Sequence, residues 1–254
     1  MVMRYRDPAI CLRVSDYSET SQVAVFLTRN EGVVRLLAKG TKRAKSKSGG
    51  AVDLLSEGEL VFTLGRSGGL GVLVEFTETV SHTPLRLQSA RLNAALYLIE
   101  LAGEMLAQED PHPEVFDLLH NGLGRLGQAD APIAAVVAYF QWRLLRNVGL
   151  LGELDHCVSC GREVALAGGR GAWFSAAAGG VLCNACCAGA GERVKVDGKT
   201  MAALAALSAA ESGRKVQLPD DQAERVKGLL SYHITYQLGK PLKLTKHVIG
   251  PKRP

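Results

Sequence analysis

Several common signatures are missing from this sequence, and each absence argues against a class of protein. Among its 254 residues, no charge-free run approaches the ~18 apolar residues that a membrane-spanning helix needs. The start, Met-Val-Met-Arg, lacks the basic-then-apolar pattern of a secretory signal. None of the six histidines lies in an HExxH motif. We therefore expect an intracellular protein in a reducing compartment, without a membrane segment.

Other catalytic and cofactor-binding patterns are incomplete. Gly198-Lys199-Thr200 resembles the end of a phosphate-binding loop, but Arg193 stands where that motif requires a glycine. The glycine-rich stretches 65–71 and 168–171 lack the strand-to-helix setting of a dinucleotide fingerprint. The sequence therefore predicts a protein that is not an enzyme.

Cysteine is scarce, yet four of the six cysteines form two hooks, and this is the most informative pattern in the chain. Cys157 and Cys160 form one C-x-x-C pair, and Cys183 and Cys186 form the other. A tight turn lets each pair present two thiolates to one tetrahedral ion. Between the pairs, Trp173–Ser175 and Val181–Leu182 read as two short strands. We predict one structural zinc ion in a ribbon-like module.

Other readings of the cysteines stay open. They include two disulfides, a thiol redox site and a catalytic zinc, although four thiolates leave no position for water. Cys187 or His156 can replace a neighbouring ligand. Cys11 lies in an apolar run and is expected in the core.

The first eighty residues read as five strands separated by turns. Both faces of the second strand are apolar enough for a small closed barrel, and a longer excursion follows the third strand. We predict an OB-type barrel, with an SH3-like barrel as the rival. The expected strands are Ile10–Val14, Gln22–Thr28, Gly32–Ala38, Glu59–Leu64 and Gly71–Thr77.

After Pro84 the apolar residues take helical spacing, so the predicted fold is multidomain α+β: a barrel, then an all-α region with the zinc module inserted. The expected domains are 1–80 for the barrel, 81–150 and 193–254 for the two parts of the helical domain, and 151–192 for the zinc module. The expected helices are Leu85–Gln108, Glu114–Leu126, Pro132–Val148, Lys199–Ser212 and Asp220–Leu238. Asp130 is a candidate N-cap of the third.

The net charge of +5 is unevenly distributed, with basic ends and an acidic middle. The densest basic cluster has no acid between Glu31 and Asp53, and glycines and serines make its loop pliable. We predict that this loop follows a phosphate backbone, with a salt slope of roughly −4 on single strands if all six cations engage, at ~0.7 per contact. A merely solvated loop is the alternative. The six cations are Arg35, Lys39, Lys42, Arg43, Lys45 and Lys47.

Two further features bear on nucleic-acid binding. The basic tail from Lys240 to Arg253 is interleaved with apolar residues, so part of it can pack as an extended segment. Most barrel aromatics are expected in the core, so binding should rest on charge more than on base stacking. Those aromatics are Tyr5, Tyr17, Phe26, Phe62 and Phe76.

Several runs along almost the whole chain are similar in sequence, and in order, to one known protein family. These runs are Val25–Gly32, Ala38–Gly40, Phe116–Leu119, Leu144–Gly149, Leu154–Gly161 and Leu238–Lys243. Together they resemble the RecO family, whose members are recombination mediators of bacterial DNA repair.

The resemblance implies an OB barrel followed by a helical domain with the zinc module, in a cytoplasmic, nucleoid-associated bacterial protein. It implies binding to single- and double-stranded DNA and annealing of complementary strands. The implied partners are RecR, the C-terminal tail of single-stranded-DNA-binding protein (SSB) and, indirectly, RecA, whose loading it assists. From the residues alone, a zinc-ribbon transcription regulator remains the alternative.

Overall fold

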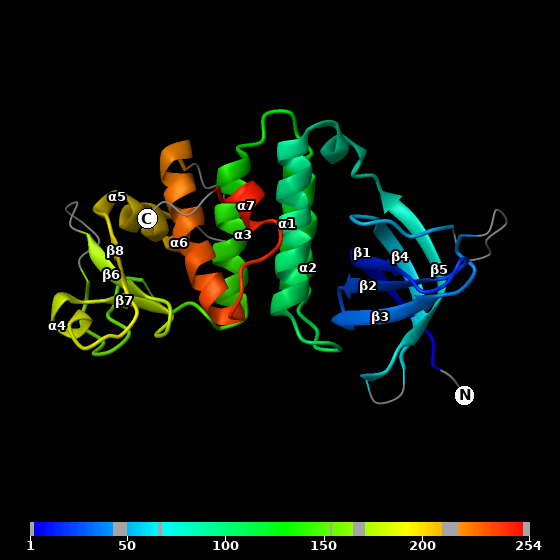
Figure 1. Cartoon of the computed structure of the whole chain (residues 1–254), viewed down its shortest axis with the longest axis horizontal. Coiled ribbons are helices and arrows are strands. Elements are labelled where there is room, and N and C mark those ends of the chain that lie inside the picture. Colours follow the sequence, from blue (N-terminus) through cyan, green and yellow to red (C-terminus); the bar gives the residue numbers. More distant parts are fainter. Residues whose placement is uncertain are drawn as a thin grey trace. The chain divides into compact units, whose positions relative to one another are not determined.

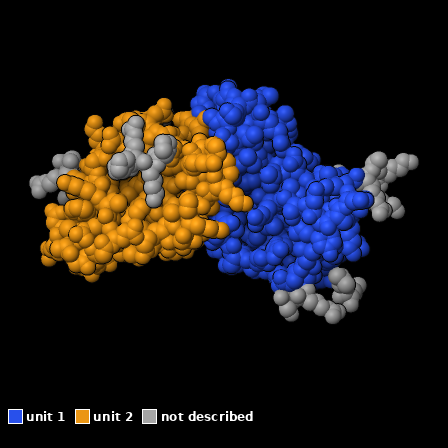
Figure 2. Space-filling model, viewed as in Figure 1, with its two compact units in different colours: residues 1–131 blue, residues 132–254 orange. Residues whose placement is uncertain are grey.

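The computed structural model describes residues 3–42, 50–65, 68–152, 154–164, 171–209 and 218–250. Contacts between Cα atoms divide the chain into two compact units, residues 1–131 and 132–254, coloured separately in Figure 2. Each unit has its own apolar core. Among the described residues, no helix combines the length and apolar character needed to cross a bilayer.

The first unit begins with five strands that close into a barrel in the order β1-β2-β3-β5-β4 (Figure 1). Closure comes from a short parallel pairing of β3 with β5, where Leu36 lies opposite Gly71. The predicted five-stranded OB-type barrel is therefore confirmed. The first strand, β1, and the last strand, β5, are longer than predicted. The bounds are β1 Tyr5–Asp16, β2 Gln22–Thr28, β3 Val33–Ala38, β4 Glu57–Thr63 and β5 Gly71–Val80.

Alternating side chains of these strands fill the barrel interior. Phe26, Leu60 and Phe62 are fully buried there, and the Phe26 and Phe76 rings lie 5.3 Å apart between centroids. Cys11 belongs to the same core, as predicted, and burial raises the pKa of its thiol to about 12. A packed interior leaves only the outer surface of the barrel available for binding.

Two helices cover one part of that outer surface. A 3-10 turn, η2 (Thr83–Leu87), leads into α1 (Ser89–Met105), and α2 (Pro113–Leu126) follows. Helix α1 packs against β1 and α2 against β2. Under them lies a buried outward-facing row of the sheet in which Ile10 pairs with Leu27 and Leu27 with Val33. Burying this row accounts for the apolar character of both faces of β2.

The turn between β2 and β3 fixes this packing. Arg29 binds Asp117 of α2 through two hydrogen bonds of 3.0 and 2.9 Å, and this partner holds the pKa of Asp117 below its ordinary value. Asp7 accepts hydrogen bonds from the backbone N–H and the side-chain amide of Asn30, both 2.7 Å. Gly32 has φ +73°, and a Cβ there would lie 2.4 Å from the Asp110 carbonyl oxygen. Only glycine permits this approach.

A buried carboxylate makes a further link between barrel and helix. Glu57 on β4 lies between His82 Nε2 at 2.8 Å and His120 Nδ1 of α2 at 2.5 Å. Burial of Glu57 opposes its ionisation, but the two histidine contacts prevail and lower its pKa. The contact between β4 and α2 therefore depends on the Glu57 carboxylate, each oxygen of which is hydrogen-bonded to a histidine.

The second unit pairs α3 (Ile133–Asn147) with α6 (Asp220–Leu238) and adds α5 (Gly198–Ala209) beside α6. The chain segment that connects α3 to α5 contains a three-stranded sheet in the order β7-β6-β8, which Figure 1 shows in yellow-green to yellow. Its strands are β6 Ala172–Ser175, β7 Gly180–Leu182 and β8 Val194–Val196, with α4 (Asn184–Cys187) after β7. The predicted hairpin is confirmed by the pairing of Trp173 with Leu182.

Buried contacts join this small sheet to the helices of the same unit. His233 of α6 is fully buried, donates from Nε2 to the Leu150 carbonyl oxygen at 2.7 Å and meets the Phe174 ring edge-on at 5.4 Å. Gln237 donates to the Ala176 carbonyl oxygen at 3.1 Å. The orientation of the sheet in this unit therefore rests on α6.

Three details differ from the sequence-based expectations. Strand β8 was not predicted, because a three-residue strand between polar neighbours gives too short a pattern. The tail contains a short helix, α7 (Thr245–Val248), where an extended segment was expected. Asp130 does not cap α3, whose N-cap is Pro132; Asp130 binds Arg125 at 2.9 Å instead.

Candidate nucleic-acid interface and metal centre

The helices leave open a part of the outer barrel surface that carries cations. Arg13 of β1 pairs with Val25 of β2, and Val25 pairs with Arg35 of β3, so the three side chains form a row on the outer face. Both arginines are exposed. Lys39, four residues after Arg35, is exposed on the same side. No ion pair joins Arg13, Arg35 or Lys39 to the described part of the chain.

A second row beside the first is mostly apolar. Across the register lie Ser15, Val23, Leu37 and Val72, from β1, β2, β3 and β5 in turn. Val23 and Leu37 are half-buried, and Val72 is 37% exposed. The uncovered face therefore combines apolar side chains with separated cations, and such cations can contact the phosphates of single-stranded nucleic acid.

The six predicted DNA-binding residues have three different outcomes. Arg35 and Lys39 lie on the face just described. Lys42 lies beside it, but its Nζ contacts Asp16 Oδ1 at 2.5 Å, so its charge is partly engaged by the protein itself. Arg43, Lys45 and Lys47 lie outside the described residues, and their predicted role stays a prediction.

The predicted basic loop between β3 and β4, here called the basic segment, has described residues on either side of it at Thr41 and Val52. One buried side chain, that of Gln22, binds both of them. Gln22 Oε1 accepts hydrogen bonds from the Thr41 hydroxyl at 3.2 Å and from the Val52 backbone N–H at 3.1 Å, while its Nε2 donates to the Val52 carbonyl. The Lys42 backbone N–H donates to Thr20 of the β1–β2 loop at 3.3 Å. The segment thus leaves and re-enters the barrel beside the β1–β2 loop.

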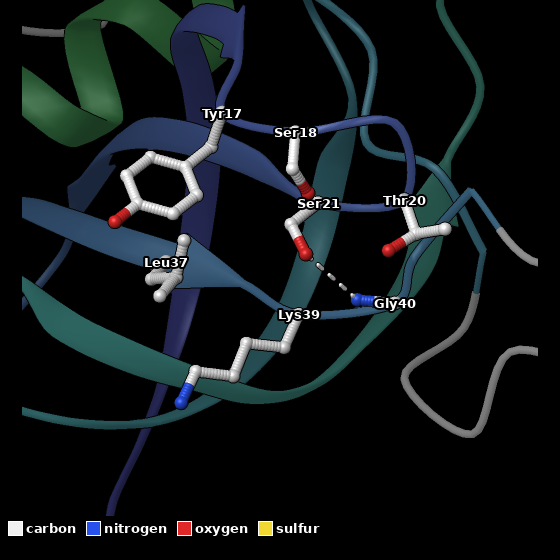
Figure 3. A pocket seen from close by; sticks show the side chains of 7 residues that line it. All are labelled: Tyr17, Ser18, Thr20, Ser21, Leu37, Lys39 and Gly40. Carbon is white, nitrogen blue, oxygen red and sulfur yellow. Dashed lines mark hydrogen bonds between the residues drawn. The ribbon is translucent and has the colours of Figure 1, made fainter.

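A shallow hollow of about 330 Å³ opens at this place (Figure 3). Figure 3 shows the Tyr17 ring beside Leu37 of β3, and Lys39 just beyond the end of that strand. Tyr17 is 64% exposed, which makes it an exception to the expectation of core aromatics. The walls of the hollow are formed by Tyr17, Ser18, Thr20, Ser21, Leu37, Lys39 and Gly40.

The four cysteines of the two hooks come together in the second unit. The Sγ atoms of Cys157, Cys160, Cys183 and Cys186 all lie within 4.8 Å of one another, and Cys160 and Cys183 are 3.8 Å apart. A tetrahedron with Zn–S bonds of ~2.3 Å has edges of ~3.8 Å, so the group can hold a zinc-sized ion. The thiolate donors also suit a soft or borderline ion better than Mg²⁺ or Ca²⁺.

The local electrostatics of the group fit a cation as well. Burial opposes ionisation of Cys157, but nearby backbone amides, including that of Cys183, outweigh it and lower the thiol pKa to about 6. Hydrogen bonding to Cys160 and Cys183 raises the pKa of Cys186 to about 12. Ionisation of one thiol thus disfavours ionisation of the next, and a bound divalent ion removes the repulsion between the thiolates.

Neither proposed substitute takes a place in the cluster. The Cys187 thiol contacts the Asn184 carbonyl oxygen at 3.2 Å, and His156 Nδ1 lies 2.9 Å from Asp155. The first hook is tied to β7 by a 2.9 Å hydrogen bond from Val158 N–H to the Val181 carbonyl oxygen. An ion held here therefore joins both hooks to the hairpin between them.

Comparison with known proteins agrees with this architecture. The family model described as recombination protein O, N terminal, matches residues 1–80, and the one described as recombination protein O, C terminal, matches residues 86–246. The chain belongs to the RecO family. A Myxococcus xanthus protein named DNA repair protein RecO is 32% identical over 241 residues, covering 94% of this chain and 95% of its own length. An Anaeromyxobacter dehalogenans protein of the same name is 31% identical over 261 residues, covering 98% of each chain.

RecO membership makes this chain a DNA repair protein, and it does not favour the transcription-regulator alternative. Gly65–Gly69 spells G-x-S-x-G, but the segment connects the antiparallel strands β4 and β5. A nucleophile elbow requires a strand-to-helix turn instead, so the match gives no support for a serine hydrolase.

Two residues of the candidate interface in this RecO-family chain were missed by sequence reasoning. Arg13 stands alone in an apolar strand, and only the register with Val25 and Arg35 reveals its neighbours. Tyr17 follows Asp16 and precedes Ser18 in a turn, and that position was itself a signal, because turns lie at the surface.

Proposed function

We propose that this RecO-family protein is a non-enzymatic mediator of recombinational DNA repair, which binds single- and double-stranded DNA and anneals complementary strands. The observation that supports the proposal best is the uncovered outer barrel face. There, Arg13, Arg35 and Lys39 surround apolar residues beside the basic segment, and this arrangement suits a phosphate backbone.

Annealing needs no bond chemistry in this mechanism. Cations on the barrel displace the counterions of each strand, and the release of those counterions supplies most of the affinity. Two strands that are both neutralised in this way repel each other less, so their pairing accelerates. Contacts to phosphate should be weakly sequence-specific.

The metal, proposed to be one zinc ion, has a structural role in this account. Cys157, Cys160, Cys183 and Cys186 would hold it, and its binding free energy would stabilise the fold of the hairpin. Four thiolates close the coordination shell, so the ion would present no site for a substrate. The division into a barrel, two helical parts and a zinc module likewise belongs to the proposal.

The proposed partners come from family membership. They are RecR, the C-terminal tail of SSB and, indirectly, RecA, whose loading the protein would assist on SSB-coated DNA. A cytoplasmic, nucleoid-associated location belongs to the same proposal.

Annealing of SSB-coated complementary strands tests the proposal. Lys45→Glu with Lys47→Glu should slow pairing and weaken DNA binding together, because both depend on the same phosphate contacts. Lys195→Glu with Lys199→Glu changes the net charge equally at exposed positions of the other unit. This control should leave both rates close to wild type. Equal effects of the two variants would show that net charge, rather than the barrel loop, drives annealing.

A further inference from the structure

Tyr17 is displayed outside the barrel by a loop that is held in place. Its backbone N–H donates to the Ser21 carbonyl at 2.9 Å, and the Ser18 N–H donates to the same oxygen at 3.1 Å. The Ser21 hydroxyl in turn accepts from the Gly40 N–H at 3.3 Å, which ties the loop to the end of β3. A ring that is 64% exposed on a fixed loop can bind a planar partner with little loss of conformational entropy.

The hollow next to the ring has a mixed chemistry. Leu37 gives it an apolar wall, Ser18 and Ser21 add hydroxyl groups, and Lys39 places a cation at its edge (Figure 3). Val72 of β5, paired with Leu37, extends the apolar surface. A flat apolar ligand with polar edges and an attached anion satisfies all of these groups.

We propose that Tyr17, Leu37 and Lys39 form a stacking site for one unpaired base of single-stranded DNA, with Lys39 on the adjoining phosphate. This inference rests on the proposed DNA-binding function and adds a preference for single strands. In a duplex, both faces of each base are already stacked, so the site would act only on unpaired nucleotides. Base stacking at this one site then adds to binding that rests mainly on charge.

The charges around the hollow favour DNA over a peptide. Two acids, Asp16 and Glu19, lie in or beside the same loop and would attract a basic peptide. Asp16, however, is engaged by Lys42, whereas Arg13, Arg35 and Lys39 continue the cationic surface along β1 and β3. An anionic chain with planar groups therefore fits the surface better than a cationic one.

Oligonucleotides with and without bases test the inference. The affinity for a thymidine oligonucleotide is compared with that for an abasic sugar–phosphate oligonucleotide of equal length and charge, at fixed salt. Tyr17→Ala should weaken thymidine binding about tenfold, leave abasic and duplex binding unchanged and keep the salt slope. Tyr17→Phe and Tyr17→Trp should retain wild-type affinity, because the ring face supplies the contact.

The matched control is Tyr236→Ala, which removes another exposed tyrosine, from α6. It should bind the thymidine oligonucleotide as the wild type does. Equal binding of thymidine by wild type and Tyr17→Ala, as expected if the hollow takes a protein segment instead, would overturn the stacking site while leaving DNA binding intact. Failure of the wild type to bind any oligonucleotide would refute the proposed function itself.

Discussion

At the scale of single residues, the balance between Lys42 and Asp16 decides how much of the barrel's charge reaches DNA. Their contact of 2.5 Å is exposed, and an exposed ion pair contributes only about 0–1 kcal/mol to stability. Breaking it should therefore change binding more than folding. Asp16 also directly precedes Tyr17, so it places a negative charge next to the loop that carries the proposed stacking site.

Replacing this acid should strengthen DNA binding. Asp16→Asn frees the Lys42 ammonium and removes a negative charge, so single-strand affinity should rise several-fold and the salt slope should steepen by about 0.7. Fluorescence titration at a series of salt concentrations measures both quantities. Asp53→Asn, which frees Arg86 from a similar exposed pair of 2.8 Å, is the control. If the two variants behave alike, the Lys42–Asp16 pair has no special place in the interface.

The β2–β3 turn requires the positive φ of Gly32. Gly32→Ala should lower the free energy of unfolding by about 2 kcal/mol or more, from its positive φ and the backbone contact at Asp110. Gly124→Ala on α2, where a Cβ meets nothing within 4 Å, should instead stabilise the protein by up to about 1 kcal/mol. Denaturant unfolding measures both, and a neutral Gly32→Ala would contradict the tight docking described here.

At the scale of elements, the helices and strands that have a strong local sequence pattern were predicted correctly. The alternation in β2 and the helical spacing of α1, α2, α3 and α6 gave the correct element types, and the C-x-x-C spacing predicted the hairpin of β6 and β7. The cluster of four sulfur atoms followed from the same spacing. These features depend on residues close together in the chain.

Features that depend on distant pairing could not be predicted. The row of Arg13, Val25 and Arg35 requires the register of three strands. The buried state of Ile10 requires the helices α1 and α2, which begin only at Ser89 and Pro113. The Glu57 contacts with His82 and His120 are of the same kind. The expectation that most barrel aromatics are in the core did not say which one is exposed, and the structure shows that Tyr17 is.

His233 of α6 should make the second unit sensitive to acid. Burial lowers the pKa of its imidazole, while the hydrogen bond to the Leu150 carbonyl opposes that effect. Below pH ~6.5 the unfolded chain takes up a proton that the folded chain resists, so the free energy of unfolding falls as the pH drops. His233→Asn removes this titration.

The test compares the two proteins over a pH series. The deficit in stability of His233→Asn at pH 8 should shrink by pH 5.5, as measured by urea unfolding. His247→Asn, a change in the exposed part of α7, is the control and should track the wild type. A deficit that stays constant with pH would show that His233 contributes packing alone.

At the scale of the whole molecule, two units carry separate tasks in the proposal. The barrel unit presents cations to DNA, and the second unit holds the cysteine cluster. The two family models match residues 1–80 and 86–246 of the chain, so the evidence for family membership comes from both units.

Metal removal should therefore unfold one part of the chain and spare the other. Wild-type protein should contain one zinc ion per chain, and Cys183→Ser should lose it, with a cost to the hairpin on the order of 10 kcal/mol. Amide hydrogen exchange should then rise in β6 and β7 and stay slow in β1 to β5. Cys187→Ser should retain the metal, because its thiol lies outside the cluster. Full zinc content in Cys183→Ser would remove Cys183 from the ligand set.

The most direct test of the account measures how salt changes the affinity of the barrel face for single-stranded DNA. The wild type is compared with Arg13→Ala, Arg35→Ala and Lys39→Ala combined, since these exposed side chains leave the core intact. The plot of log affinity against log salt should lose about 2 units of slope, from ~0.7 per phosphate contact for three contacts. An unchanged slope in a folded triple variant would contradict the assignment of this face to DNA.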